Sequence, residues 1–344
     1  MTSEPQPRRP RIGVLCGART RHGPESVFLR FMRDHYDILR EFDFCATGGT
    51  AQSIVDIGLY PEERVEFLNS GSRGGVVQLT ARVAKGEFVA VLFLTDPRDL
   101  WADVPENRAL KRVCIEKQVH LITTRAGADE WAVHEARNAL SAAAGQSLSS
   151  WKPKNWFAGV KNVLDGEHID LPLDETTLAL ISHNQMKQEM VKFVNNHVHQ
   201  LAGFHRILAT GTTGWMLRLV QAKNESLGHL STEAKQHLGQ KRLGEIMADL
   251  PTVEEPHKNQ RFVDIVMPLA SGPKGGDVLI ANEILKHRCH KIVFFYDPET
   301  AHPHEADIRL LERTAQLDSV YAFCISDPRS ADLWAQDLPQ RNFP

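Results

Sequence analysis

The stretch LASGPKGGD, residues 269–277, has a counterpart earlier in the chain, LNSGSRGGV at residues 68–76. A second pair follows, IVFFYDP at residues 292–298 and VLFLTDP at residues 91–97. Both pairs are separated by the same 201 residues, so the segments between the motifs match in length without a gap. An ungapped internal match of this kind indicates a duplicated domain.

A further pair of motifs shows where the two copies differ in length. CATGGT at residues 45–50 resembles LATGTT at residues 208–213, but these two are separated by 163 residues. The second copy therefore carries about 38 extra residues between its glycine-rich motifs, at about residues 223–261.

The second copy alternates short apolar runs with amphipathic stretches, which is the pattern of strands and helices in turn. The predicted strands are residues 178–182, 207–209, 262–267, 291–297 and 320–326, and the predicted helices are residues 186–198, 215–222, 278–287 and 306–316. Five strands separated by helices predict a mostly parallel sheet covered on both faces, because parallel strands need crossover connections.

We therefore predict an α/β fold of two tandem three-layer αβα domains, each with a mostly parallel five-stranded sheet. The first domain is expected at residues 11–144 and the second at residues 176–344. Residues 145–175 contain Pro, Gly and Ser and are expected to link them. A chain of 344 residues is long enough for two ordinary domains.

The composition is that of an ordinary folded protein. Hydrophobic residues make up 42% of the chain and charged residues 24%, which excludes a disordered protein. The formal net charge of −3 argues against a nucleic-acid or membrane-surface partner. The five cysteines are scattered without CxxC spacing, and the sequence shows neither a signal peptide nor an apolar run of about 18 residues. We therefore expect a cytoplasmic protein.

The loops that follow the predicted strands carry the informative residues, because ligands of open α/β sheets bind at the carboxyl ends of the strands. In ATGTTG, residues 209–214, backbone N–H groups and threonine hydroxyls can hold a phosphate. A glycine turn with threonine N-caps is the alternative. SGPKGGD ends in Asp277, where an acid can also simply complement a helix dipole. ISHNQMK places His183 and Lys187 after the first strand of this copy.

The loop DPETAHPHEAD, residues 297–307, is richer in ionisable residues than a connector requires. Its prolines restrict the backbone and would hold His304 and Asp307 in place, although a solvated loop capped by Asp307 is the alternative. Histidines and a cysteine cluster nearby in sequence: His287, Cys289, His290, His302 and His304. We nevertheless predict no metal site, because HRCH lies at the end of a helix, away from this loop.

Taken in order, SHNQMK, ATGTTG, SGPKGGD and DPETAHPHEAD resemble the loops of methylglyoxal synthase, through residues 178–335 apart from the insertion. The resemblance implies a lyase that converts dihydroxyacetone phosphate to methylglyoxal and inorganic phosphate. It also implies that the partner is a small phosphorylated substrate, that no metal or organic cofactor is used, and that the protein is a homo-oligomer, in the family usually a hexamer. The first half resembles the same domain family with eroded motifs.

The resemblance assigns roles to particular residues. Asp277 would be the base that removes a carbon-bound proton next to the ketone. His304 would hydrogen-bond the substrate oxygens where negative charge develops, and Asp307 and His183 would orient groups or relay protons. The positions that match the family's phosphate contacts are Lys187, Thr210, Thr212, Thr213, Ser271 and Gly272. Phosphate is both anchor and leaving group, so these contacts would contribute to binding and to elimination.

Three features depart from the family pattern. Asn184 stands where the family usually has an acid after the histidine. The insertion falls between two substrate loops, where it can cap, block or widen the site. Family members also extend an arginine from near the C-terminus into a neighbouring subunit's site, for which Arg341 is a candidate.

The first copy lacks the acid–base residues. Val76 stands at the position of Asp277, and because a valine cannot accept a proton, we predict that this copy is not a synthase. The other three catalytic positions hold Gly17 or Ala18, Asp103 and Glu106. The phosphate-loop residues persist with added positive charge: Thr47, Gly48, Thr50, Ser70 and Gly71, with Arg19 and Arg73. This copy would bind a phosphorylated effector or take the place of a second subunit.

A non-catalytic sensor of a phosphorylated metabolite competes with the enzyme, because the same domain type also serves as an allosteric module. The acids and histidine that the second copy retains favour the enzyme, since a sensor needs a phosphate pocket but no base. The insertion and the inactive first copy favour the sensor. Because each chain carries two copies, a trimer of chains would contain six domains.

Overall fold

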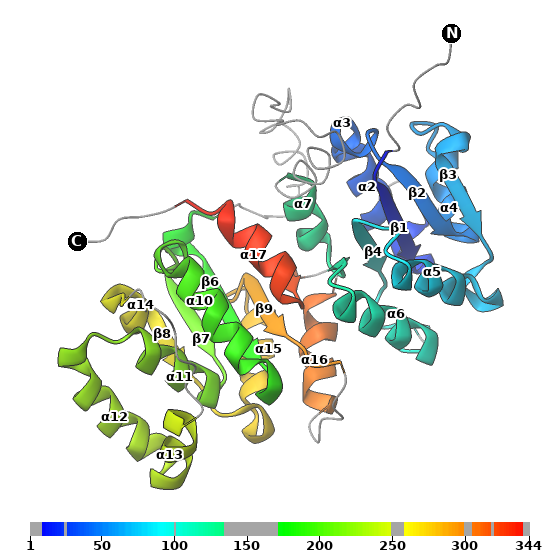
Figure 1. Cartoon of the computed structure of the whole chain (residues 1–344). Helices are drawn as coiled ribbons and strands as arrows, with labels where there is room; N and C mark the ends of the chain where they lie inside the picture. Colours follow the sequence, from blue (N-terminus) through cyan, green and yellow to red (C-terminus); the bar gives the residue numbers. More distant parts are fainter. Residues whose placement is uncertain are drawn as a thin grey trace. The chain divides into compact units, whose positions relative to one another are not determined.

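The computed structural model describes residues 9–23, 26–99, 101–133, 171–248, 258–298, 305–317 and 320–339 (Figure 1). The chain divides into two compact units, of which the first comprises Met1–Ile169 with Gln316–Phe323 and the second Asp170–Ala315 with Cys324–Pro344. Each unit contains one five-stranded sheet. The predicted α/β class is therefore confirmed.

The first unit alternates strands with helices. Its strands are β1 (Arg11–Cys16), β2 (Asp43–Thr47), β3 (Val65–Leu68), β4 (Ala90–Leu94) and β5 (His120–Ile122). Its helices are α1 (Ala18–Arg21), α2 (Val27–Asp34), α3 (Tyr36–Leu39), α4 (Gly48–Asp56), α5 (Gly75–Ala84), α6 (Pro105–Glu116) and α7 (Arg125–Val133), with 3-10 turns at Glu62–Arg64 and Gly71–Arg73. The sheet order is β3-β2-β1-β4-β5, and every pair of neighbours is parallel.

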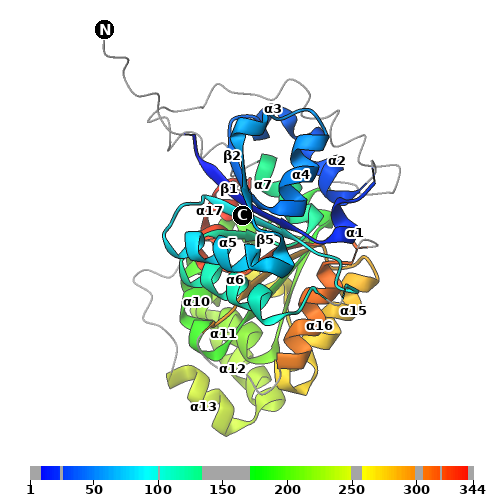
Figure 2. The ribbon, with the colours of Figure 1, turned by 90° about the vertical axis from the view of Figure 1, so that its right-hand side faces the viewer.

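Buried side chains cover both faces of this sheet. Along β1, Ile12 and Val14 belong to one hydrophobic cluster, whereas Leu15 belongs to another. This alternation follows from the two-residue repeat of a strand, which points successive side chains to opposite faces. Helices α2, α3, α4 and α7 pack in the first cluster and α5 and α6 in the second (Figure 2). The first unit thus has the predicted three layers.

The second unit has the same succession with additional helices. Its strands are β6 (Thr177–Ser182), β7 (Arg206–Ala209), β8 (Val266–Pro268), β9 (Lys291–Phe295) and β10 (Phe323–Ile325). Its helices are α10 (Lys187–Leu201), α11 (Gly211–Gln221), α12 (Asn224–Leu238), α13 (Gln240–Ala248), α14 (Gln260–Ile265), α15 (Gly276–Leu285), α16 (Glu305–Ala315) and α17 (Pro328–Gln336), with 3-10 turns at Leu173–Glu175, Asn184–Met186 and Gly272–Lys274. The sheet order is β10-β9-β6-β7-β8.

The two sheets have equivalent strand orders and equivalent registers. Phe44 of β2 pairs with Val65 of β3, and Ile207 of β7 pairs with Val266 of β8. These pairs differ by the same 163 and 201 residues that separate the sequence motifs. The ungapped match in the sequence is therefore matched by the hydrogen-bonded ladders.

One predicted strand is wrong in most of its length. Residues 262–267 were expected as a strand, but α14 continues to Ile265 and β8 begins only at Val266. The side chain of Asn259 accepts a hydrogen bond from the backbone N–H of Phe262 at 3.0 Å and thereby caps the helix. A local cap therefore outweighs the β-propensity of a run rich in Val and Ile.

Two further boundaries differ from expectation. Helix α11 begins at Gly211, so the glycine-threonine stretch forms the first turn of the helix instead of preceding it. Leu173–Glu175, expected at the end of the linker, already form a 3-10 turn before β6, whereas residues 134–170 lie outside the described residues. None of the helices that the structure describes is both long enough and apolar enough to cross a lipid bilayer.

Candidate functional site

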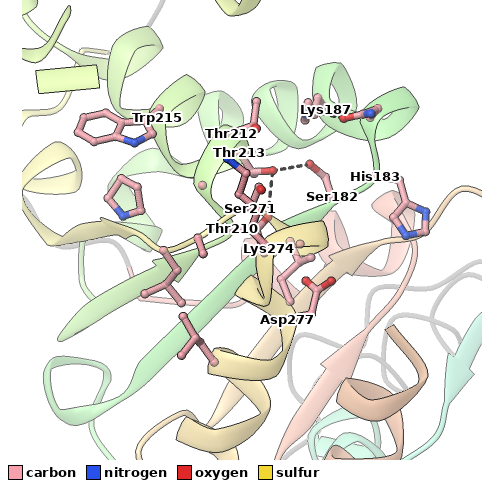
Figure 3. A pocket seen from close by; sticks show the side chains of 18 of the residues that line it. Ser182, His183, Lys187, Thr210, Thr212, Thr213, Trp215, Ser271, Lys274 and Asp277 are labelled. Carbon is pink, nitrogen blue, oxygen red and sulfur yellow. Dashed lines mark hydrogen bonds between the residues drawn. The ribbon is translucent and has the colours of Figure 1, made fainter. Parts of the chain in front are cut away.

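A cavity of about 930 Å³ opens at the carboxyl ends of β6, β7 and β8 in the second unit (Figure 3). Eight of the ten site residues expected from the sequence line it: His183, Lys187, Thr210, Thr212, Thr213, Ser271, Gly272 and Asp277. They come from three loops that are far apart in the sequence. The parallel sheet brings these loops together because all its strands end at the same edge.

The threonine loop between β7 and α11 lies at the centre of this cavity. The hydroxyl of Thr213 is 3.2 Å from the hydroxyl of Ser182 and 3.4 Å from that of Thr210 (Figure 3). The first-turn N–H groups of a helix have no partner within the helix, and the helix dipole favours an anion there. The first turn of α11, flanked by these hydroxyls, is therefore suited to a phosphate group.

A glycine lets the neighbouring loop approach the start of α11. The backbone N–H of Gly211 donates to the carbonyl oxygen of Ala270 at 3.0 Å. A Cβ atom on Gly211 would lie only 2.8 Å from the carbonyl oxygen of Leu269. Any larger residue would therefore separate the threonine loop from the loop that carries Ser271.

The SGPKGGD loop turns sharply into α15. The carbonyl oxygen of Ser271 accepts hydrogen bonds from the backbone N–H of Lys274 at 2.8 Å and of Gly276 at 3.0 Å. Gly275 has a φ of +87°, which favours glycine. A Cβ on Gly276 would lie 2.1 Å from the carbonyl oxygen of Ala270. This turn places Asp277 in the first turn of α15, where the residue is only 2% exposed and lines the cavity.

His183 is held in a defined orientation at the end of β6. Its Nδ1 atom accepts a hydrogen bond from the backbone N–H of Asp297 at 2.9 Å. Its ring packs against the rings of Phe294 and Tyr296, with centroids 5.0 and 4.8 Å away. An Nδ1 that accepts a hydrogen bond carries no proton, so the hydrogen bond assigns the neutral ring proton to Nε2. The imidazole thus presents a donor at Nε2.

Lys187 contacts the residue that departs from the family pattern. Its Nζ atom donates to Oδ1 of Asn184 at 2.7 Å, and both residues line the cavity. An aspartate at position 184 would place a negative charge beside this ammonium group. The asparagine accepts the same hydrogen bond without neutralising the positive charge.

Three expected residues lie beyond what the structure describes. His304 and Arg341 are outside the described residues, and Asp307 lies in α16 with a side chain that is not described. Their predicted roles stay predictions.

The cavity also contains residues that sequence reasoning did not select: Ser182, Trp215, His237, Leu238, Lys274 and Leu279 among them. Lys274 lies inside the SGPKGGD motif, so the sequence could have indicated that it lines the cavity. Trp215 follows Thr212 by three residues and therefore lies on the same side of α11. His237 and Leu238 belong to the stretch at about residues 223–261 that the first unit lacks, so comparing the sequences of the two units did not indicate them.

Two residues of the alternative metal cluster, His302 and His304, lie outside the described residues, whereas His287, Cys289 and His290 lie in the part of the chain that the structure describes. No group of three His, Cys, Asp or Glu side chains suited to a metal ion occurs there. Nδ1 of His290 accepts a hydrogen bond from the backbone N–H of Thr177 at 3.0 Å. Cys289 is 2% exposed, and burial raises the pKa of its thiol to about 12.

Comparison with known proteins relates the chain to one family. A family model described as an MGS-like domain matches residues 28–123. The methylglyoxal synthase of Agrobacterium fabrum is 32% identical over 140 residues, which cover 41% of this chain and 78% of that protein. The methylglyoxal synthase of Moorella thermoacetica is 31% identical over 145 residues, which cover 42% and 80%. The chain belongs to the methylglyoxal synthase family.

Other members of the methylglyoxal synthase family are also similar. The protein of Oleidesulfovibrio alaskensis is 28% identical over 149 residues, which cover 43% of this chain and 73% of that protein. Among solved structures, methylglyoxal synthase from Elizabethkingia anophelis NUHP1 aligns at 23% identity with a TM-score of 0.30, over 51% of this chain and 95% of that chain. The family-model match lies in the first unit, whose loops were expected to be the eroded ones.

The first unit has the same loop geometry as the second unit but not its predicted base. Gly74 has a φ of +87°, and a Cβ on Gly75 would lie 1.9 Å from the carbonyl oxygen of Asn69, as in the SGPKGGD turn. The next residue is Val76, which is 4% exposed. The same backbone turn therefore presents a hydrocarbon where the second unit presents the carboxylate of Asp277.

The position of His183 is also changed in the first unit. The backbone N–H of Gly17 donates to the carbonyl oxygen of Leu94 at 2.8 Å, and that of His183 donates to Phe295 at 3.1 Å. These equivalent hydrogen bonds select Gly17 over Ala18 as the counterpart of His183. A glycine supplies no ring nitrogen, so this loop of the first unit lacks the polar side chain that His183 provides in the second unit.

An arginine lies over the threonine loop of the first unit. The guanidinium of Arg21 donates to the carbonyl oxygen of Gly49 at 3.4 Å and lies 2.8 Å from where a Cβ of Gly49 would be. Gly49 is the counterpart of Thr212 at the offset of 163 residues. A threonine side chain there would require Arg21 to move.

Proposed function

We propose that the second unit is a methylglyoxal-synthase-like lyase that converts dihydroxyacetone phosphate to methylglyoxal and inorganic phosphate. The observation that carries this proposal is the placement of a buried carboxylate, Asp277, in one cavity with the threonine loop and His183. A lyase of this kind needs a base and a phosphate anchor within reach of one small molecule.

The proposed reaction uses these groups in sequence. The phosphate of the substrate binds at the first turn of α11 and at Ser271, with Lys187 as a counter-charge. Asp277 accepts the proton from the carbon next to the ketone, and the C–H electron pair moves into the enediolate. Nε2–H of His183 donates to the developing oxyanion. The carbon–oxygen bond to phosphate then breaks, and its electron pair leaves with the phosphate. The remaining enol takes up a proton at its terminal CH2 carbon and loses its hydroxyl proton to give methylglyoxal.

By the resemblance to the family, His304 would also stabilise the enediolate, and Asp307 would orient groups or relay protons. We further propose that the two units are tandem copies of one domain, of which the first no longer catalyses, because Val76 cannot act as a base. A trimer of chains would then provide six domains. Light scattering that shows a monomer would reject this assembly.

A non-catalytic phosphate-binding regulatory protein is the second candidate. Two observations favour it: the first unit has lost Asp277 and His183 equivalents, and the insertion contributes to the wall of the cavity. A regulatory protein would bind phosphorylated metabolites at the threonine loop without turning them over.

Incubation of the purified full chain with dihydroxyacetone phosphate separates the two candidates. If the second unit is a lyase, methylglyoxal should form above the uncatalysed background. Asp277→Asn is then expected to lower kcat by about 10²- to 10⁴-fold, because the substitution removes the base. Asp264→Asn is the matched control, because Asp264 is exposed on α14 and does not line the cavity.

Inorganic phosphate should still raise the melting temperature of Asp277→Asn, because a ligand that binds only the folded state stabilises it. A folded wild-type chain that binds phosphate but makes no methylglyoxal would reject the lyase in favour of the regulatory protein. An Asp277→Asn chain with unchanged turnover would reject Asp277 as the base.

A further inference from the structure

One end of the cavity is formed by two stacked rings. The rings of Trp215 on α11 and His237 on α12 have centroids 5.4 Å apart and planes inclined by 26°. Trp215 is 4% exposed, whereas His237 is exposed, and both line the cavity. The buried indole therefore stacks on one side of the imidazole. The imidazole itself is exposed and remains accessible to a ligand.

The inserted helix is fixed in this position by a second contact. Arg218 on α11 donates to Oε1 of Glu233 on α12 at 3.3 Å. The guanidinium of Arg218 also lies 4.9 Å from the centroid of the Trp215 ring, a cation–π contact. Glu233 and His237 are four residues apart, so they lie on the same face of α12. The insertion thus holds His237 against the cavity through a paired charge and a ring stack.

The ring pair lies next to the proposed phosphate anchor, on the side away from the acid–base residues. Figure 3 shows Trp215 at one end of the cavity, Thr212 and Thr213 in the middle and His183 toward the other end. A ligand anchored at the threonines can therefore extend in two directions. One direction leads to His183 and the other to the ring pair.

The cavity is larger than a three-carbon phosphate ester requires. Its volume of about 930 Å³ is near the upper limit of the range of about 300–1,000 Å³ that holds drug-sized ligands. A three-carbon substrate would leave the space beside the ring pair to water. Leu238, next to His237, adds an apolar wall to that space.

We propose that Trp215, His237 and Leu238 form a subsite for a planar ring carried by the phosphorylated ligand. The ligand class is an organic phosphate whose substituent extends beyond the phosphate and stacks on the imidazole of His237. This inference deepens the proposed function and rests on its assignment of the threonine loop as the phosphate anchor. The insertion is then a specificity element that the first unit lacks.

Calorimetric titration of the full chain with inorganic phosphate, glycerol 3-phosphate and phenyl phosphate tests the subsite. Phenyl phosphate is expected to bind about three- to tenfold more tightly than glycerol 3-phosphate, which is the gain that a ring pair contributes. His237→Ala should abolish this preference and leave the affinity for inorganic phosphate unchanged. Gln236→Ala is the matched control, because Gln236 is exposed on the same helix and does not line the cavity.

Equal affinities of the two esters for the wild-type chain would overturn the subsite, as would a His237→Ala chain that keeps the preference. An equal loss of affinity for all three ligands in His237→Ala would also overturn it, since that result reports damage to the phosphate anchor. Binding is measured without turnover, so a chain that prefers phenyl phosphate but makes no methylglyoxal would reject the lyase and retain the subsite. A chain that binds none of the three ligands would reject both.

Discussion

The backbone N–H of Asp297, after β9, donates to Nδ1 of His183, after β6, at 2.9 Å. This hydrogen bond joins the ends of two adjacent strands and assigns the neutral ring proton to Nε2. The loop of Asp297 thus determines which ring nitrogen of His183 carries the proton.

His183→Asn tests this arrangement. The asparagine Oδ1 can accept the hydrogen bond from Asp297 in place of Nδ1, but no donor remains where Nε2 was. We expect the melting temperature to change little and kcat to fall by about 10²- to 10⁴-fold, because the oxyanion loses its donor. Steady-state kinetics with dihydroxyacetone phosphate measure the effect. Turnover equal to that of the wild-type chain would contradict the role assigned to His183.

Gly276→Ala is expected to destabilise the second unit, because its Cβ would lie 2.1 Å from the carbonyl oxygen of Ala270. Overpacking of this kind costs about 1–3 kcal/mol or more of the free energy of unfolding. Gly228→Ala on α12 is the matched control, because nothing lies within 4 Å of its Cβ position. That variant should gain about 0.5–1 kcal/mol, since glycine is unfavourable inside a helix.

Urea titration of both glycine variants gives the comparison. If Gly276→Ala were as stable as the wild-type chain, the close approach of the SGPKGGD loop to the carbonyl oxygen of Ala270 would be refuted.

Asn184→Asp is expected to weaken the binding of inorganic phosphate. The new carboxylate would accept from Lys187 and offset its positive charge, which lowers the affinity by about three- to tenfold at low salt. Gln185→Glu adds the same charge at a neighbouring residue that does not line the cavity, so it serves as the control. Calorimetric titration at two salt concentrations should show that salt reduces the difference. Tighter phosphate binding by Asn184→Asp would contradict the electrostatic role of Lys187.

The first unit is expected to lose stability in acid through Asp96, which is 1% exposed. Its carboxylate accepts from the backbone N–H, Nε and Nη2 of Arg98, each at 2.8 Å. These hydrogen bonds, the side-chain ones above all, hold the pKa of Asp96 below its usual value. A lowered folded-state pKa contributes stability that is complete above the unfolded pKa of about 4. The contribution is lost as the pH falls from there through the folded-state pKa.

Asp96→Asn should therefore lower the free energy of unfolding by about 1 kcal/mol at pH 7 and by less near pH 3. Asp103→Asn is the control, because the ion pair of Asp103 with Arg108 is exposed on both sides and is expected to contribute little. Denaturant unfolding across this pH range measures the difference. If the loss of unfolding free energy in Asp96→Asn grew toward acid pH, the lowered pKa of Asp96 in the folded state would be refuted.

Several features of the fold could be predicted from sequence because they repeat at fixed distances. Strand β6 before the SHNQMK motif, the glycine-rich turn before α15 and the buried strand β9 all follow patterns of alternation and spacing that depend on neighbours in the chain. The prediction of a strand at residues 262–267 was wrong for a related reason. Its apolar residues suit either a strand or a buried helix, and the Asn259 cap that decides between them acts through one hydrogen bond.

Periodicity and motif order in the amino-acid sequence were enough to predict the two five-stranded sheets, a length difference of about 38 residues between the two units and eight residues that line the cavity. How the cavity is bounded depends instead on contacts between segments far apart in the chain. The donor atom of His183 depends on a hydrogen bond from Asp297, 114 residues later. The stack of His237 on Trp215 depends on where an inserted helix packs, and packing between distant segments leaves no periodic trace in the chain.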